Sequence, residues 1–130
     1  MELDIHLTSD LEGQLEAYPI QKYDKNELLL KQGTVADGCY FLVRGNVKAL
    51  VTEDELDRSV ILGTHFSAGD MLAVKEVFSA QPALYSLICH DSVEARFIPH
   101  TELQKLIKTS PNFYGFLIQA MSKQFSVLEQ

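Results

Sequence analysis

The sequence predicts a mainly β domain, a sandwich or barrel of short strands with flanking helices, and two features of the chain indicate this class. Apolar residues recur with period two in short runs, as from Val47 to Val51, which is the spacing of a strand with one buried face. Turn signals separate these runs at intervals of about ten residues, which is typical of antiparallel β folds and not of βαβ units. The 130 residues are enough for one domain with a real core.

The first element is predicted to be a helix over residues 9–16. Ser9 can cap this helix, and Glu12 can complete a capping box because it follows three residues later. Leu11 and Leu15 lie four residues apart and therefore share one helix face. The pattern places a short helix before the first strand.

The middle of the chain is predicted to consist of strands and turns. The strand-like runs are residues 20–23, 28–32, 39–44, 47–51, 59–66, 84–89 and 93–98. Gly45-Asn46 joins two of these runs tightly, so we expect a hairpin with a positive φ angle at that point. Residues 52–57 are polar and acidic and are expected to form a hairpin tip, and residues 75–80 are expected to form one helical turn.

A helical pattern returns at the C-terminal end. Leu103, Leu106 and Ile107 have the spacing of a helix that packs on the barrel. A second helix begins at Ser110-Pro111, with Pro in its first turn. Its apolar residues cover more than half of its circumference, which is too wide for contact with one barrel and predicts pairing with a second copy. These residues are Phe113, Phe116, Leu117, Ala120, Met121, Phe125, Val127 and Leu128.

Charge and hydropathy exclude several classes of protein. The formal net charge of −7 opposes contact with nucleic-acid phosphates, so this chain alone is not expected to bind DNA. No apolar run of about 18 residues is present, so we expect no membrane-spanning segment. The acidic start, Met1-Glu2-Leu3-Asp4, lacks the order of a signal peptide, and we expect a cytoplasmic protein.

Two segments carry a resemblance to a known family. The first contains Gln32, Gly33, Tyr40, Phe41, Leu42, Gly45 and Val47, and the second contains Gly69, Asp70, Leu72, Pro82 and Ser86. With these residues the chain resembles the cyclic nucleotide-binding domain of the Crp/Fnr superfamily. The resemblance covers residues 18–130 and implies an eight-stranded double-sheet jelly roll, also called a double-stranded β-helix. It divides the single domain, 1–130, into an N-terminal helix (1–17), a β-roll (18–99) and C-terminal helices (100–130).

The second segment lacks the charged residues of the family's phosphate-binding cassette. That cassette reads G-D-x-[FI]-G-E-[LI]-[AG]-L, then a loop, then P-R-[SA]-A-[TS]. Ala73 stands at the second Gly, Val74 at the ribose-binding Glu, and Ala83 at the phosphate-binding Arg. A buried anion needs a paired cation or several donors. The resemblance therefore implies the frame of the site without its usual ability to bind cyclic nucleotides.

The candidate ligand pocket consists of cassette positions and two strand residues that the resemblance adds. They are Leu72, Ala73, Val74, Pro82, Ala83, Leu84, Tyr85 and Ser86 in the cassette, with Val60 and Leu62 in a strand. Three hypotheses stay open: a sensor of a small apolar or aromatic effector, a weak cyclic-nucleotide site helped by Lys75, and a ligand-free dimerisation scaffold whose side chains fill the space. Lys75 and Glu76 are interpreted mainly as a solvated face. No cofactor is assigned.

Neither catalysis nor metal binding is indicated. A jelly-roll enzyme of the cupin type would need clustered His and Glu, whereas the histidines are scattered, at His6, His65, His90 and His100. Cys39 and Cys89 lie inside predicted strands. We interpret them as small buried residues, with a disulfide or redox sensor as the alternative.

The resemblance also implies a function. In Crp/Fnr proteins the long C-terminal helix pairs with its copy and leads into a helix-turn-helix domain, and this chain stops within that helix. We therefore expect no DNA-binding domain in this chain. The expected function is that of a regulatory ligand-sensing and dimerisation domain of a Crp/Fnr-type transcription regulator or signalling protein, not an enzyme.

Overall fold

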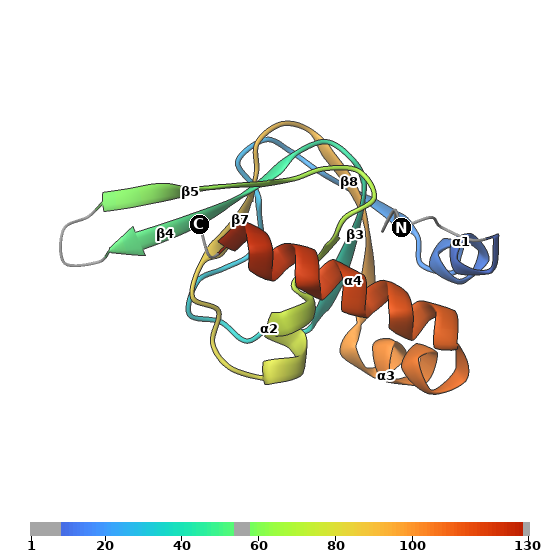
Figure 1. The fold of residues 1–130 in the computed structure, drawn as a ribbon. Helices are drawn as coiled ribbons and strands as arrows, with labels where there is room; N and C mark the ends of the chain where they lie inside the picture. Colours follow the sequence, from blue (N-terminus) through green and yellow to red (C-terminus); the bar gives the residue numbers. More distant parts are fainter. Residues whose placement is uncertain (1–8, 54–57, 129–130) are drawn as a thin grey trace.

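The computed structural model shows a roll of short strands with helices packed beside it (Figure 1). It describes the backbone of residues 9–53 and 58–128, and the side chains of residues 11–53 and 65–122. The helices are α1 (Ser9–Glu16), α2 (Val74–Ser79), α3 (His100–Thr109) and α4 (Pro111–Leu128). The strands are β1 (Ile20–Tyr23), β2 (Leu28–Leu30), β3 (Gly38–Arg44), β4 (Val47–Glu53), β5 (Arg58–Phe66), β6 (Met71–Leu72), β7 (Ser86–Cys89) and β8 (Val93–Pro99).

Two four-stranded sheets form the roll, with strand orders β1-β8-β3-β6 and β2-β7-β4-β5. The strand pairs within them are antiparallel. The predicted double-sheet jelly roll with an N-terminal helix and two C-terminal helices is therefore confirmed. Strand β6 was not predicted, because two residues are too few to show a period. The predicted hairpin tip at 52–57 is described only as far as Glu53.

The turn at Gly45-Asn46 changes sheets, so the predicted hairpin between β3 and β4 is wrong. Strand β3 pairs with β6 and β8, whereas β4 pairs with β5 and β7. Gly45 does have the expected positive φ, 96°. The turn crosses the β7–β8 turn, where the backbone N–H and the side-chain amide of Asn46 each donate to the Asp91 carboxylate at 2.8 Å. These bonds lower the pKa of Asp91, and the His90 N–H donates back to the Asn46 carbonyl at 2.8 Å.

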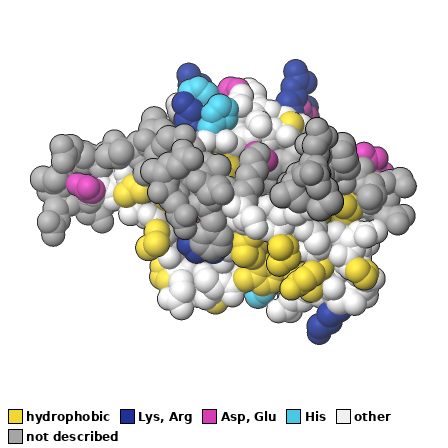
Figure 2. Space-filling view, viewed as in Figure 1, with side chains coloured by type: hydrophobic (Ala, Val, Ile, Leu, Met, Phe, Trp, Pro, Cys, Tyr) yellow, Lys and Arg dark blue, Asp and Glu magenta, His cyan; other side chains and the backbone are white. Residues whose placement is uncertain are grey.

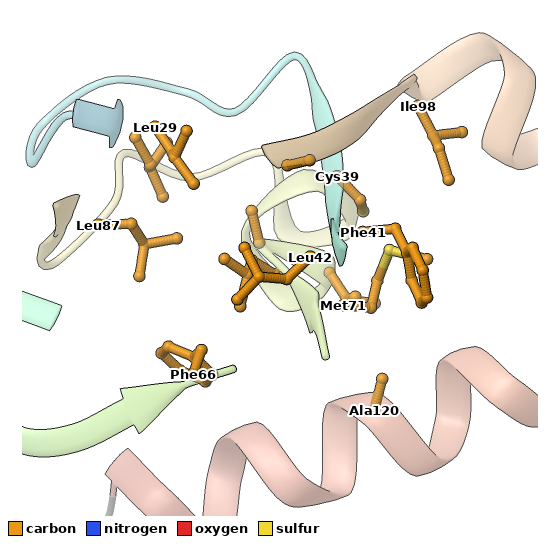
Figure 3. Close-up of a cluster of buried hydrophobic side chains, with 14 of the residues drawn as sticks. Leu29, Cys39, Phe41, Leu42, Phe66, Met71, Leu87, Ile98 and Ala120 are labelled. Carbon is orange, nitrogen blue, oxygen red and sulfur yellow. The ribbon is translucent and has the colours of Figure 1, made fainter. Parts of the chain in front are cut away.

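A single core fills the space between the two sheets and the helices. Figure 3 shows side chains from both sheets pointing into this cluster, including Leu42 of β3 and Leu87 of β7, with Ala120 of α4 directed toward it from the helix side. The amphipathic pattern of α1 also contributes, because Leu11 and Leu15 are both buried. The fold thus depends on apolar side chains from each layer, as burial-driven packing requires.

Helix α4 contacts α2, α3, β5 and β6, and it lies across the roll in Figure 1. Because these elements cover one whole side of the helix, four residues that we predicted for a dimer surface are core residues of their own chain: Phe113, Phe116, Leu117 and Ala120. The wide apolar surface of α4 is accounted for because α2 and α3 pack against it in addition to the strands. The exposed side of α4 carries Tyr114 and Ile118, and Met121 is half-buried. The side chains of Phe125, Val127 and Leu128 lie outside the described residues.

The sheet-changing turn provides a test of the fold. A Cβ atom at Gly45 would lie 2.4 Å from the Ser92 carbonyl oxygen, and the residue has a left-handed φ. We expect Gly45→Ala to lower the free energy of unfolding by about 2 kcal/mol or more, measured by urea denaturation. The matched control is Gly13→Ala in α1, where a Cβ would meet no atom within 4 Å; it should stabilise the protein by about 0.5–1 kcal/mol. Equal effects of the two changes would contradict the proposed crossing.

Candidate ligand-binding site

The cassette begins with a turn that is fixed to strand β3. Gly69 has φ of 95°, and its N–H donates to the Leu42 carbonyl at 2.8 Å. The Leu42 N–H donates to the Asp70 carbonyl at 2.9 Å. The buried Asp70 carboxylate accepts from the Ser67 N–H at 2.9 Å, which closes the turn. The predicted Gly-Asp turn therefore anchors the segment that leads into β6 and α2.

Ala73, at the position of the family pattern's second Gly, has a backbone conformation that Gly adopts more easily than other residues. Its φ is 68° and its ψ is 22°, in the left-handed region, directly before α2. A non-Gly residue in this region costs about 1 kcal/mol or more, and it persists because the surroundings fix it. Here the Ala73 side chain is fully buried, and its carbonyl accepts from the Val77 N–H at 3.1 Å.

The second half of the cassette is held against residues 32–34 by backbone bonds. The Ala83 N–H donates to the Thr34 carbonyl at 2.9 Å, and the Gly33 N–H donates to the Ala83 carbonyl at 2.8 Å. The Gln32 N–H donates to the Ser86 hydroxyl at 2.8 Å. Ser86 is therefore a structural link, and the backbone groups of Ala83 are engaged within the protein.

Beside α2 lies a cleft of about 490 Å³. Its lining residues are Lys75, Glu76, Ser79, Gln81, Pro82, Ala83, Leu84 and Tyr85. Four of them belong to the predicted pocket. The predicted residues Leu72, Ala73 and Val74 instead belong to the buried core and do not line this cleft. The side chains of Val60 and Leu62 lie outside the described residues.

Two buried polar side chains, Glu76 and Tyr85, form a pair in this cleft that was not predicted from the sequence. Glu76 is 4% exposed and Tyr85 is 6% exposed, and the Tyr85 hydroxyl donates a hydrogen bond to Oε1 of Glu76. The interpretation of Glu76 as a solvated charge is therefore wrong. One signal was available: Glu76 stands at the [AG] position of the cassette pattern, and Tyr85 stands at its Ala. Two small residues are thus replaced by two large polar ones that contact each other.

The family profile described as cyclic nucleotide-binding domain matches residues 20–110. The chain belongs to this family. This cyclic nucleotide-binding domain is 26% identical over 121 residues to the cAMP-activated global transcriptional regulator CRP of Salmonella typhimurium. The match covers 92% of the chain and 57% of that relative, so the domain spans less than two thirds of the relative's length.

Solved structures show the same fold. The c-di-GMP-responsive global regulator CLP of Xanthomonas campestris matches with a TM-score of 0.77 and 22% identity, over 92% of this chain and 59% of that one. A transcriptional regulator of Thermotoga maritima matches with a TM-score of 0.78 and 17% identity, over 92% of each chain. CRP and the Thermotoga maritima protein are named as transcriptional regulators, and the two solved structures, which are both less than 25% identical to this chain, show the likeness of the fold.

Among the described residues, no three His, Cys, Asp or Glu side chains come together in a way that could hold a metal ion. None of the helices in the described part of the chain is long and apolar enough to cross a membrane.

Both cysteines of the domain are buried free thiols. Burial, with the charge of Glu76 as a smaller cause, raises the pKa of the Cys39 thiol well above its ordinary value. Burial also raises the pKa of Cys89 to about 11, with smaller contributions from Glu27 and Asp91. A thiol must ionise and be accessible to react. These two residues therefore have the character of core residues and not of redox sensors.

This protonation state gives a test. At pH 8 both thiols should be protonated, since each pKa lies well above that pH, and neither should react with Ellman's reagent in the folded domain. Both should react after unfolding in guanidinium chloride, where a cysteine has a pKa of about 8.5. Because the folded-state values are raised, the domain should also lose stability as the pH rises above about 8.5. Rapid labelling of one thiol in the native state would restore the sensor hypothesis.

Proposed function

We propose that this chain is the regulatory domain of a Crp/Fnr-type transcription regulator or signalling protein, and that it does not bind cyclic nucleotides in the usual way. One observation carries the proposal: Val74 and Ala83, at the positions of the family's ribose-binding Glu and phosphate-binding Arg, are buried apolar residues. The fold supplies the frame of a sensor, but the charged partners of the usual ligand are absent at these positions.

The size of this loss follows from the chemistry of the ligand. A cyclic phosphate is a permanent anion, and removing one partner of a buried ion pair costs about 3–5 kcal/mol, or roughly a thousandfold in affinity. Val74 also cannot accept a hydrogen bond from a ribose hydroxyl. The Ala83 N–H is bound to Thr34, so it does not replace the missing side chain. The Glu76 carboxylate adds a negative charge close to the same loop.

A second candidate is a genuine but weak cyclic-nucleotide site. The similarity to a regulator named as cAMP-activated favours it, and Lys75 lines the cleft. Lys75 would act as a point charge and lacks the planar fork with which Arg binds a phosphate. We therefore rank this candidate below a domain that responds to another effector or acts as a dimerisation scaffold.

Calorimetry with cyclic AMP and cyclic GMP separates these functions. We expect no dissociation constant tighter than about 100 μM for either nucleotide, because the phosphate and ribose lack their usual partners. The companion variant is Lys75→Met, which should leave this weak binding unchanged. A low-micromolar dissociation constant for either nucleotide, together with loss of this binding in Lys75→Met, would establish the second candidate and reject the first.

Restoring the two family residues shows whether space remains for the nucleotide. Val74 is fully buried, so Val74→Glu with Ala83→Arg should lower the free energy of unfolding by several kcal/mol. Urea denaturation measures this effect. A double variant that stays folded and binds cyclic AMP in the micromolar range would show instead that only the charges were missing.

We also propose that two copies pair through the exposed side of α4. Tyr114 and Ile118 are large apolar residues on this side, and Phe78 of α2, which contacts α4, is exposed as well. Figure 2 shows apolar side chains gathered in the lower half of this face of the molecule. A patch of this kind is a common site of association.

Sedimentation equilibrium tests the pairing. Ile118→Glu should shift the protein from dimer to monomer at tens of micromolar, since a charge would enter an apolar interface at a cost of a few kcal/mol. The matched control is Ile20→Glu, because Ile20 is similarly exposed (42%, against 45% for Ile118) but lies on β1. This control should remain dimeric. A monomeric wild-type domain would rule out the dimer. Leu117 is unsuitable for this test because it is buried in its own chain.

Binding of DNA and the site of action in the cell stay predictions. Because the relatives are longer than this chain, we propose that any contact with DNA belongs to a different domain. The net charge of −7 agrees with that division. We place the domain in the cytoplasm on the sequence argument alone.

A further inference from the structure

The cleft beside α2 has the size of a small-molecule site. Its volume of about 490 Å³ lies within the range of roughly 300–1,000 Å³ that is typical of ligand pockets. Pro82, Ala83 and Leu84 supply apolar walls, and Tyr85 lines the same cleft. A molecule with a compact apolar or aromatic body would bury its surface against these groups.

One buried charge sets the polarity of this cleft. Glu76 lines it, is 4% exposed, and is oriented by the hydrogen bond from Tyr85. A carboxylate accepts hydrogen bonds and donates none. At an effective dielectric constant of about 20, a negative charge on the ligand about 5 Å from this carboxylate would lower the binding affinity by a few hundredfold. A positive charge at the same distance would raise the affinity by a similar factor.

Lys75 is the other charged residue among those that line the cleft, and it reduces this preference without reversing it. Lys75 is half-buried, whereas Glu76 is buried. The two residues are neighbours on α2, so their side chains leave the helix about 100° apart. Lys75 carries its charge on a long flexible stem, whereas the Glu76 carboxylate is buried and accepts the hydrogen bond from Tyr85. The buried group decides which ligand is favoured.

We propose that this cleft binds small aromatic or apolar molecules that carry a positive charge or N–H donors, with Glu76 as the anchor and Tyr85 as its positioning residue. The inference rests on the proposed function, because it names the class of effector that the regulatory domain senses. The proposed charges are opposite to those of a cyclic-nucleotide site. Here the ligand carries the positive charge and the protein carries the negative charge.

A matched series of probes tests this preference. Phenethylammonium, 2-phenylethanol and 3-phenylpropionate have similar bodies and carry a positive, zero and negative charge. Each is titrated into the ¹⁵N-labelled chain, and the amide shifts are followed by NMR. We expect shifts centred on residues 75–85, with phenethylammonium binding at least about tenfold more tightly than 3-phenylpropionate. This order in the wild-type protein requires no substitution, so it does not depend on a variant that folds.

Substitutions then test which residue causes the preference for the ammonium probe over the carboxylate probe. Glu76→Gln should bring the dissociation constants of the ammonium and carboxylate probes to within about threefold of each other. Tyr85→Phe should weaken the binding of phenethylammonium by about three- to tenfold and preserve the order of the probes' affinities. Lys75→Met should not weaken the ammonium probe. The control Glu16→Gln, at an exposed carboxylate of α1, should change nothing.

The outcomes separate this inference from the proposed function. Equal or tighter binding of 3-phenylpropionate, a preference that survives Glu76→Gln, or the absence of any shift would each overturn the inference. Cyclic AMP is titrated into the same sample as a separate measurement. A low-micromolar constant for it would overturn the proposed function as well, whereas weak binding would leave that function in place.

Discussion

The two-sheet architecture depends on the crossing of two turns, where Asn46 meets Asp91. At this point the chain leaves the sheet of β3 and enters the sheet of β4, so the bonds between these residues hold the two sheets face to face. Gly45 makes the crossing possible, because a side chain there would collide with the backbone of Ser92. The core lies between the sheets that this turn connects, and α4 packs against β5, β6, α2 and α3 beside it.

The backbone of the cassette is held in place by hydrogen bonds that do not depend on the charged side chains of the family pattern. The turn at Gly69 and the left-handed residue Ala73 keep the backbone of the cassette in place through bonds to β3 and to α2 itself. These bonds do not involve the side chains that would contact a nucleotide. Apolar residues at the positions of the family's charged side chains are therefore compatible with the fold. Ala73 has to tolerate an uncommon conformation for an L-residue with a side chain.

The buried pair of Glu76 and Tyr85 changes what the site can recognise. A carboxylate in a cleft needs donors or a positive charge nearby, and Tyr85 supplies one donor. Leu84, which also lines this cleft, is 76% exposed. Together these residues describe a site that favours cations over anions, in a family whose usual site is arranged for a phosphate.

The sequence by itself determined the class of fold, the family and the short N-terminal helix, because turn residues and apolar periods are local signals. Ser9 and Leu11 predicted α1, and the cassette predicted the loss of the phosphate partners. Tertiary structure alone decided which strands pair, since Gly45-Asn46 has the sequence of a hairpin but changes sheets under the constraint of Asp91. It also decided that Phe116 packs inward and that Glu76 is buried. Such outcomes depend on contacts between segments far apart in the chain, which no local pattern records.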